Sequence, residues 1–281
     1  MSENVNSENC SHQCEGCSVE NCGARQNPQS LLIEPDSRSS IRRIIGVVSG
    51  KGGVGKSFVT SMLAAEMQRR GRRTAVLDGD ITGPSQGKAF GIKEKAYGDG
   101  ELIIPAYTKS GIQLISTNML LENDDTPVLW RGPMVANILK QFYQEVYWNN
   151  VDVMFVDMPP GTSDVPLTLF QSFKLDGIIV VTSPQELVSM IVEKAINMAN
   201  TMNVKVLGLI ENMSYVECPK CHEKMYVFGK SHIDATADKF NLPVLARIPL
   251  DPAIAEASDA GTIEDIEVPQ IKEAVDFIQN L

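Results

Sequence analysis

An octapeptide early in the chain sets narrow limits on its architecture. Residues 50–57 read G-K-G-G-V-G-K-S and fit the pattern G-x-x-x-x-G-K-[ST] of a phosphate-binding loop. The apolar run 43–49 before it is typical of a buried parallel strand, and apolar side chains recur at helical spacing over residues 59–67. Strand, glycine loop and helix therefore follow in the order that this motif requires, which predicts an α/β fold.

The residues of this loop predict how it would bind ATP. Glycines let backbone N–H groups converge on a phosphate, and the start of the next helix adds partial positive charge. Lys56 is expected to reach the β- and γ-phosphates and Ser57 to ligate Mg²⁺, so Lys56 also counts as catalytic. The predicted nucleotide-binding residues of the loop are Gly50, Lys51, Gly52, Gly53, Val54, Gly55, Lys56 and Ser57.

A second lysine, Lys51, follows the first glycine of the loop. The form G-K-G-G-x-G-K-[ST] resembles the deviant phosphate loop of the MinD/ParA/nitrogenase iron protein class. In that class the extra lysine reaches across a dimer to the nucleotide of the partner. The resemblance therefore implies that Lys51 stabilises transition-state charge in trans, as an arginine finger does. A solvated loop lysine is the alternative.

The length, charge and cysteine content of the chain exclude several classes of function. A chain of 281 residues with 43% hydrophobic residues allows one large α/β domain plus a tail, or two small domains. A net charge of −10 argues against a nucleic-acid surface, and no apolar run is long enough to span a membrane. The polar, acidic start is unlike a signal peptide, so we expect a cytoplasmic protein. Its six cysteines are then expected to be metal ligands or redox groups.

The first 40 residues differ in composition from the rest. We expect residues 1–40 to be a flexible, cysteine-rich tail and linker, and residues 41–281 to be a P-loop ATPase domain with a C-x-x-C insertion. Four closely spaced thiols in the tail predict an iron–sulfur cluster. Zinc, with His12 as a substitute ligand, and chance clustering without metal are the alternatives. The four tail cysteines are Cys10, Cys14, Cys17 and Cys22.

Three carboxylates follow apolar runs that read as strands. Asp78 and Asp80 come after the run 74–77, and Asp157 ends the run 151–157. Carboxyl ends of parallel strands lie on the ligand side of such a sheet. Asp80 is therefore predicted to orient or activate the attacking water, with Asp78 in support, and Asp157 to join Ser57 in the Mg²⁺ shell. Helix capping and turn formation are the alternatives for Asp78 and Asp80, and a plain strand-end aspartate is the alternative for Asp157.

Further along the chain, three residues are predicted to contact the adenine base. Asn212 follows the apolar run 204–210 and is expected to hydrogen-bond the adenine edge, although a turn-forming asparagine is the alternative. Pro249 and Asp251 come after the last predicted strand and are expected to line the base pocket.

A second cysteine motif, Cys218–Pro219–Lys220–Cys221, lies within the predicted ATPase domain. Two ligands per chain cannot complete a four-thiolate site, but a twofold dimer can, because each subunit donates the same pair. We therefore expect a [4Fe–4S] cluster bridged by Cys218 and Cys221 of two chains. A redox dithiol and a zinc knuckle that recruits His222 or His232 are the alternatives.

Six motifs in order together resemble the Mrp/ApbC family of P-loop ATPases, which act as iron–sulfur cluster carriers or scaffolds. The resemblance implies a doubly wound, mostly parallel sheet, a homodimer with a bridging [4Fe–4S] cluster, and ATP-dependent delivery of that cluster to apoproteins. Gly79 and Thr82 depart from the usual family residues without removing a carboxylate. The motifs occupy residues 50–57, 78–85, 130–134, 157–164, 212–214 and 218–221.

Two other functions share this fold and motif set. A MinD- or ParA-like positioning ATPase would need a basic amphipathic C-terminal helix or a basic patch. Here the polar side of the C-terminal stripe is mainly acidic, so we expect the stripe to pack on the core and expect no membrane or nucleic-acid partner. An electron donor like the nitrogenase iron protein stays open. The stripe consists of Ile271, Ala274, Val275 and Ile278.

Overall fold

A mostly parallel sheet organises the computed structural model, which describes residues 31–81, 83–98, 100–120, 132–162 and 164–281. Within these ranges the sheet has eight strands in the order β12-β9-β8-β1-β7-β2-β6-β5, and only β5 runs antiparallel to its neighbour. The doubly wound, mostly parallel fold is thereby confirmed. The strands are β1 (Ile44–Ser49), β2 (Thr74–Asp78), β5 (Ala106–Tyr107), β6 (Gln113–Ile115), β7 (Val153–Asp157), β8 (Gly177–Thr182), β9 (Val206–Glu211) and β12 (Val244–Arg247).

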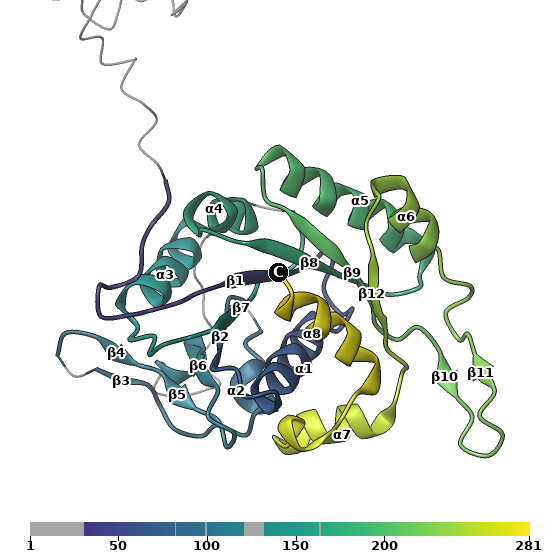
Figure 1. Ribbon diagram of the computed structural model, residues 1–281, viewed down its shortest axis with the longest axis horizontal. Helices are drawn as coiled ribbons and strands as arrows, with labels where there is room; N and C mark the ends of the chain where they lie inside the picture. The colour runs from purple at the N-terminus through teal and green to yellow at the C-terminus, as the bar shows by residue number, and fades with distance from the viewer. Residues whose placement is uncertain (1–30, 82, 99, 121–131, 163) are drawn as a thin grey trace, which may run out of the picture.

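Helices cover both faces of the sheet (Figure 1). One face carries α1 (Lys56–Arg69), α2 (Gln86–Ala89), α7 (Pro252–Ala260) and α8 (Lys272–Gln279). The other face carries α3 (Gly132–Glu145), α4 (Asp164–Ser172), α5 (Glu186–Thr201) and α6 (Ile233–Phe240). This three-layer arrangement explains why the central strands are apolar on both sides.

Strand β1 illustrates how the sequence produces this burial. Ile45 and Val47 belong to the core beneath α1, whereas Ile44 and Val48 belong to the core on the opposite face. Side chains alternate along a strand, so a strand covered on both faces needs a continuous apolar run instead of an alternating one. The same reasoning holds for β8, whose six residues are all buried.

The register of the strands gathers polar groups at one edge of the sheet. Asp157 at the end of β7 pairs with Asp78 at the end of β2 and with Val47 of β1. The phosphate loop and both carboxylates therefore meet at the carboxyl edge, where ligands bind in sheets of this kind.

Two short ladders lie outside the main sheet. One joins β3 (Tyr97–Gly98) to β4 (Ile103–Ile104), and the other joins β10 (Val216–Glu217) to β11 (Lys224–Met225). The β10–β11 hairpin projects from the body of the molecule on the side of β12 (Figure 1). Because the Cys218–Cys221 turn joins these two strands, the cysteine motif lies on a projecting hairpin.

Both ends of the described chain pack on the core. The backbone N–H of Ile33 donates to the Ser172 carbonyl at 2.9 Å, and that of Ser40 donates to the Trp148 carbonyl at 2.9 Å. The Asp36 N–H also donates to the Gln144 carbonyl of α3 at 3.0 Å, so part of the expected linker lies against the C-terminal ends of α3 and α4, while the boundary at residue 40 stays a prediction.

The expected burial of the C-terminal stripe is confirmed for Ile271, Ala274, Val275 and Ile278, which are at most 1% exposed. Among the described residues, no helix combines the length and apolarity of a membrane span.

Candidate functional site

The phosphate loop connects β1 to α1, and its glycines have separate roles. Gly53 and Gly55 both have φ near +81°, a conformation that favours glycine, and Gly55 is the N-cap of α1. A Cβ on Gly55 would lie 2.1 Å from the amide nitrogen of Asn212. By contrast, no atom lies within 4 Å of a Cβ built on Gly52 or Gly53, so the outer side of the loop is open. An open row of backbone amides at a helix start fits a phosphate group.

A buried ion pair lies at the base of this loop. The Lys56 Nζ is 2.5 Å from Asp157 Oδ1, and the two side chains are 5% and 0% exposed. Asp157 also accepts hydrogen bonds from Thr60 Oγ1 at 3.3 Å and from Gln86 Nε2 at 2.9 Å. An ammonium and a carboxylate therefore meet at the base of the loop, and their predicted roles toward phosphate and Mg²⁺ stay predictions.

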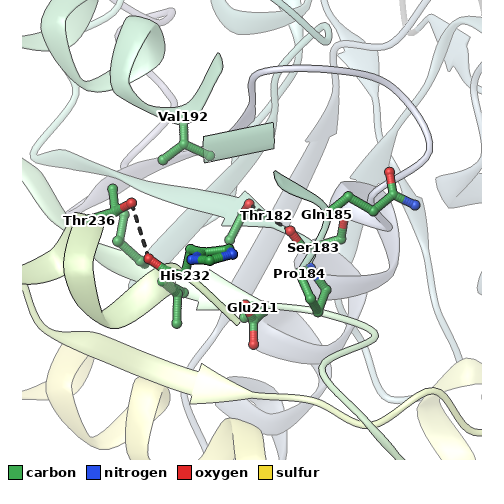
Figure 2. Close-up of a pocket in the computed structure, with 10 residues that line it drawn as sticks. Thr182, Ser183, Pro184, Gln185, Val192, Glu211, His232 and Thr236 are labelled. Atoms are coloured by element: carbon green, nitrogen blue, oxygen red, sulfur yellow. Dashed lines mark hydrogen bonds between the residues drawn. The ribbon is translucent and has the colours of Figure 1, made fainter. Parts of the chain in front are cut away.

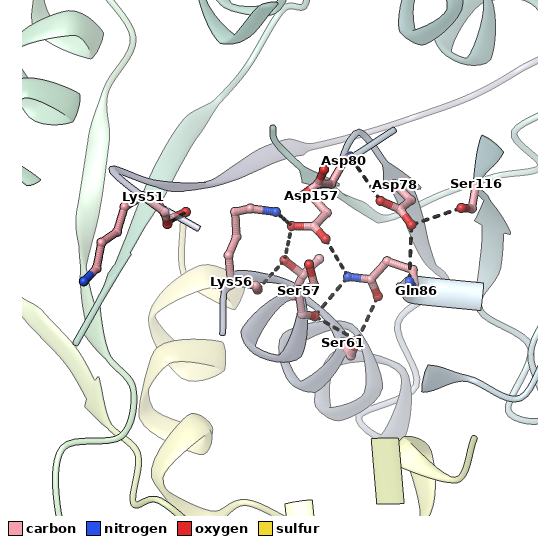
Figure 3. Close-up of polar contacts among 11 residues, drawn as sticks. Lys51, Lys56, Ser57, Ser61, Asp78, Asp80, Gln86, Ser116 and Asp157 are labelled. Carbon is pink, nitrogen blue, oxygen red and sulfur yellow. Dashed lines mark hydrogen bonds and ion pairs between the residues drawn. The ribbon is translucent and has the colours of Figure 1, made fainter. Parts of the chain in front are cut away.

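Gln86, which sequence reasoning missed, links three parts of this site (Figure 3). Its fully buried amide nitrogen donates to the Ser57 carbonyl and to Asp157 Oδ2, both at 2.9 Å. Its amide oxygen accepts from Ser61 Oγ at 2.8 Å. Gln86 starts the four-residue helix α2 directly after the 78–85 motif, and no spacing rule signals its role, because its partners come from distant parts of the chain.

Asp78 is fully buried beside this network and supports the next loop. Its carboxylate accepts from Ser116 Oγ at 3.0 Å and from the backbone N–H groups of Gln86 and Asp80, both at 3.2 Å. Burial, and then the nearby Asp157 carboxylate, raise the pKa of Asp78 to about 7, against the opposing effect of Lys56. Asp78 thus holds the backbone of the half-buried Asp80, whose own role stays a prediction.

Lys51 extends away from Lys56 (Figure 3). Its Nζ donates to Gln185 Oε1 at 2.7 Å, in the segment between β8 and α5. The side chain therefore lies on the exposed side of the loop, and its ammonium does not join the Lys56–Asp157 pair. This placement is compatible with a role toward a second subunit.

The residues expected to bind the base lie in two places. Asn212 is buried and its amide donates to the Val54 carbonyl at 3.0 Å, so it contacts the phosphate loop. Asp251 caps α7 by accepting from the Ala253 N–H at 2.9 Å, a role that its position before Pro252 signals. Pro249 and Asp251 line a groove that they share with Cys218. Their roles toward adenine stay predictions.

The cysteine turn has a defined backbone. The Cys218 N–H donates to the Glu223 carbonyl at 3.0 Å, and the His222 N–H donates to the Cys218 carbonyl at 2.9 Å. Backbone N–H groups of Cys221 and Lys220, in that order, lower the pKa of the half-buried Cys218 thiol. Cys221 is exposed. A turn that stabilises thiolate fits a soft metal centre.

No complete metal site is assembled within a single described chain. In residues 31–281, apart from the gaps given above, no three His, Cys, Asp or Glu side chains are placed to hold a metal ion. His222 Nδ1 lies 2.7 Å from Glu217 Oε1, and among the described residues neither His222 nor His232 joins the two cysteines in such a group. The tail cysteines Cys10, Cys14, Cys17 and Cys22, like Trp130 and Arg131, lie outside the described residues.

The fold and the phosphate loop define the chain as a P-loop NTPase. A family model for ParA-type proteins, described as NUBPL iron-transfer P-loop NTPase, matches residues 40–281, and the chain belongs to this family. The predictions of the family and of an ATPase involved in iron transfer are thereby confirmed. The roles assigned to single residues stay predictions.

Several relatives are similar over most of their length. An iron-sulfur cluster carrier protein of Clostridium perfringens is 44% identical over 80% of this chain and 82% of its own. One of Methanocaldococcus jannaschii is 40% identical over 90% of this chain and 89% of its own.

Solved structures also resemble the chain. A nucleotide-binding protein of Archaeoglobus fulgidus in complex with ADP has a TM-score of 0.74 and 39% identity, over 83% of this chain and 91% of its own. The MinC:MinD cell division protein complex of Aquifex aeolicus has a TM-score of 0.60 at 18% identity, over 85% of this chain and 94% of the matched one. The latter likeness shows the fold alone.

Proposed function

We propose that this protein is an ATP-dependent carrier that binds a [4Fe–4S] cluster and transfers it to apoproteins. The observation that carries the proposal is the pair Cys218 and Cys221, held on a projecting hairpin with the pKa of the Cys218 thiol lowered. Relatives of C. perfringens and M. jannaschii that bear the name iron-sulfur cluster carrier protein support it. The cluster is the cargo of this reaction.

The cluster is bound between two copies of the chain. Each copy supplies two thiolates, and a twofold axis through the cluster brings the two pairs together. Four thiolates then match the ligand count of a [4Fe–4S] cluster. The absence of a third ligand near the pair, within the described residues, supports a shared site.

ATP and Mg²⁺ occupy the open loop after β1. The backbone of residues 50–57 and the Lys56 ammonium bind the phosphates, and Ser57 and Asp157 hold Mg²⁺. Asp80 orients the attacking water, and Lys51 stabilises transition-state charge on the nucleotide of the partner subunit. The base is bound by Asn212, Pro249 and Asp251.

The remaining assignments concern organisation. We propose that residues 1–40 act as a tail and linker on the ATPase domain 41–281, that the protein is cytoplasmic, and that its partners are a second copy and apoprotein clients. The tail thiols Cys10, Cys14, Cys17 and Cys22 are spaced closely enough to bind a second iron–sulfur cluster, with zinc as the alternative.

Anaerobic reconstitution of the full chain tests the proposal. With the four tail cysteines replaced by serine, we expect about four iron and four sulfide per pair of chains, and a dimer by light scattering. Adding Cys218→Ala and Cys221→Ala should abolish cluster binding while leaving ATP binding intact. A full iron and sulfide complement in that variant would contradict the bridged site.

Transfer is measured separately by mixing the loaded protein with an apoferredoxin. The carrier function predicts that the cluster moves to the ferredoxin and that the donor loses its absorbance. A cluster that is reduced and reoxidised repeatedly without leaving the protein would instead favour an electron donor.

A further inference from the structure

The cysteine motif lies on an excursion that leaves the sheet and returns beside its starting point. Residues 212–232 depart from the end of β9 and return at the start of α6, and they include β10, the cysteine turn and β11. The base of this excursion determines how the cysteines are placed relative to the rest of the subunit.

One buried carboxylate holds both ends of the excursion. Glu211, the last residue of β9, is 1% exposed. Its Oε2 accepts from Ser214 Oγ at 2.5 Å, near the start of the excursion. Its Oε1 accepts from Ser231 Oγ, near the end, and Ser231 Oγ in turn accepts from the Ile233 N–H at 3.1 Å. Two hydroxyl donors therefore converge on one carboxylate from opposite ends of a long loop.

The same strand end contacts the phosphate loop. Asn212 directly follows Glu211, and its side chain donates to the Val54 carbonyl at 3.0 Å, against the position where Gly55 has no Cβ. The Asn212 backbone N–H also donates to the Thr182 carbonyl at 2.9 Å. A movement of the loop at Val54 would thus be transmitted through Asn212 to Glu211.

A cavity adds a second connection to the nucleotide side (Figure 2). Glu211, His232 and Gln185 all line it, and Gln185 is the residue that binds Lys51. None of the ion pairs found among the described residues involves Glu211, so hydroxyl groups are its observed partners. A buried carboxylate without a cation is costly, which suggests a role beyond stability.

We propose that Glu211 is a positioning residue that couples the phosphate loop to the cysteine turn by clamping both ends of the 212–232 excursion. The inference rests on the proposed function and names the element through which nucleotide binding reaches the cargo thiols. A carboxylate suits this role because it offers two acceptors at once. A glutamine offers one acceptor and one donor, so one serine would lose its favourable partner.

Hydrogen exchange measured by mass spectrometry on the full chain tests the coupling. With Mg²⁺ and AMPPNP, we expect exchange in residues 216–229 of the wild type to change. In Glu211→Gln and Ser231→Ala, that region should exchange roughly 2- to 10-fold faster without nucleotide, as for loss of one buried hydrogen bond, and should no longer respond to AMPPNP. Affinity for AMPPNP should stay within about threefold of wild type, because neither residue contacts the loop directly.

Two controls separate positioning from general destabilisation. Ser231→Thr keeps the hydroxyl and should restore the nucleotide response, which a merely structural loss would not predict. Glu273→Gln is the same substitution at an exposed position of α8, and this variant should show the hydrogen exchange of the wild type. If Glu211→Gln fails to fold, the comparison of Ser231→Ala with Ser231→Thr decides whether the hydrogen bond to Glu211 carries the nucleotide response.

Two outcomes would overturn the inference: no nucleotide response in the wild type, or an undiminished response in Glu211→Gln or Ser231→Ala. Cluster reconstitution of the wild type is measured in parallel. A wild type that binds no cluster would overturn the proposed function while leaving the exchange result readable.

Discussion

The Lys51 ammonium donates to Gln185 at 2.7 Å and points away from Lys56 of the same loop. The two lysines of the loop thus have different surroundings. Lys56 contacts the buried Asp157 carboxylate, and Lys51 lies at the exposed surface. This division suggests that only Lys56 serves the nucleotide of its own subunit.

Replacing Lys51 by alanine should lower kcat for ATP hydrolysis by at least about 100-fold, because charge supplied in trans is worth at least that much in related reactions. Nucleotide affinity should change little. Gln185→Ala, which frees Lys51 without removing its charge, serves as the matched control and should keep most activity.

Mixing variants tests whether Lys51 acts across the dimer. A Lys51→Ala subunit combined with a Lys56→Ala subunit should regain hydrolysis, since the second still supplies Lys51 to the nucleotide of the first. Absence of recovery in a mixture shown to contain mixed dimers would contradict action in trans.

The Lys56–Asp157 pair should dominate the stability of the loop. Asp157→Asn removes the carboxylate that the buried Lys56 ammonium contacts directly, so we expect the free energy of unfolding to fall by about 3 kcal/mol in urea titrations. A double variant, Lys56→Met with Asp157→Asn, should lose less than the sum of the losses in the Lys56→Met and Asp157→Asn single variants. Strict additivity would mean that the pair does not interact.

The raised pKa of Asp78 should make stability depend on pH. The folded protein holds this proton up to about pH 7, whereas the ordinary pKa is 3.8, so the folded state binds more protons between these values. The contribution of Asp78 is therefore complete below pH 3.8 and is lost as pH rises toward 7, at up to about 1.4 kcal/mol per pH unit.

The free energy of unfolding of the nucleotide-free protein, measured from pH 5 to pH 8, checks this dependence. The difference between wild type and Asp78→Asn should fall with rising pH and level off above about 7. A constant difference would show that Asp78 is ionised throughout.

Cys218 should react faster than an ordinary thiol near neutral pH. Its pKa is lowered by backbone N–H groups that persist when the Cys221 side chain is removed. Peptide-resolved mass spectrometry of iodoacetamide labelling in Cys221→Ala should give a midpoint for Cys218 below the ordinary value of 9.0. A midpoint at or above that value would argue against thiolate stabilisation by the turn.

Gly55 and Gly52 provide a matched pair in one loop. Gly55→Ala would place a methyl group 2.1 Å from the Asn212 amide at a φ of +81°, so we expect a loss of at least about 2 kcal/mol and weaker ATP binding. Gly52→Ala meets no atom within 4 Å and should leave the free energy of unfolding within about 0.5 kcal/mol of wild type. Equal losses would mean that close packing against Asn212 does not matter.

Much of this architecture follows from local sequence patterns. Continuous apolar runs predicted β1, β2, β7 and β9, because strands covered on both faces need such runs. The position of Asp78 and Asp157 at strand ends predicted that they would lie on the ligand side of the sheet, and the parallel register places the two residues opposite each other there.

Other parts of the site were beyond prediction. Gln86 and Glu211 acquire their roles from partners 25 to 71 and 3 to 20 residues away, respectively, and no spacing rule marks such contacts. The helix-capping role of Asp251 does have a local signal, which is the proline that follows it, although Asp251 was predicted only to line the base pocket.

The closed base of the cysteine excursion also has a consequence for protein engineering. Ser214 and Ser231 both donate hydrogen bonds to Glu211. The two ends of the intervening segment are therefore fixed next to each other at the end of β9. A different metal-binding hairpin could be grafted between these serines without disturbing the sheet, which would give the same P-loop scaffold another set of soft-metal ligands.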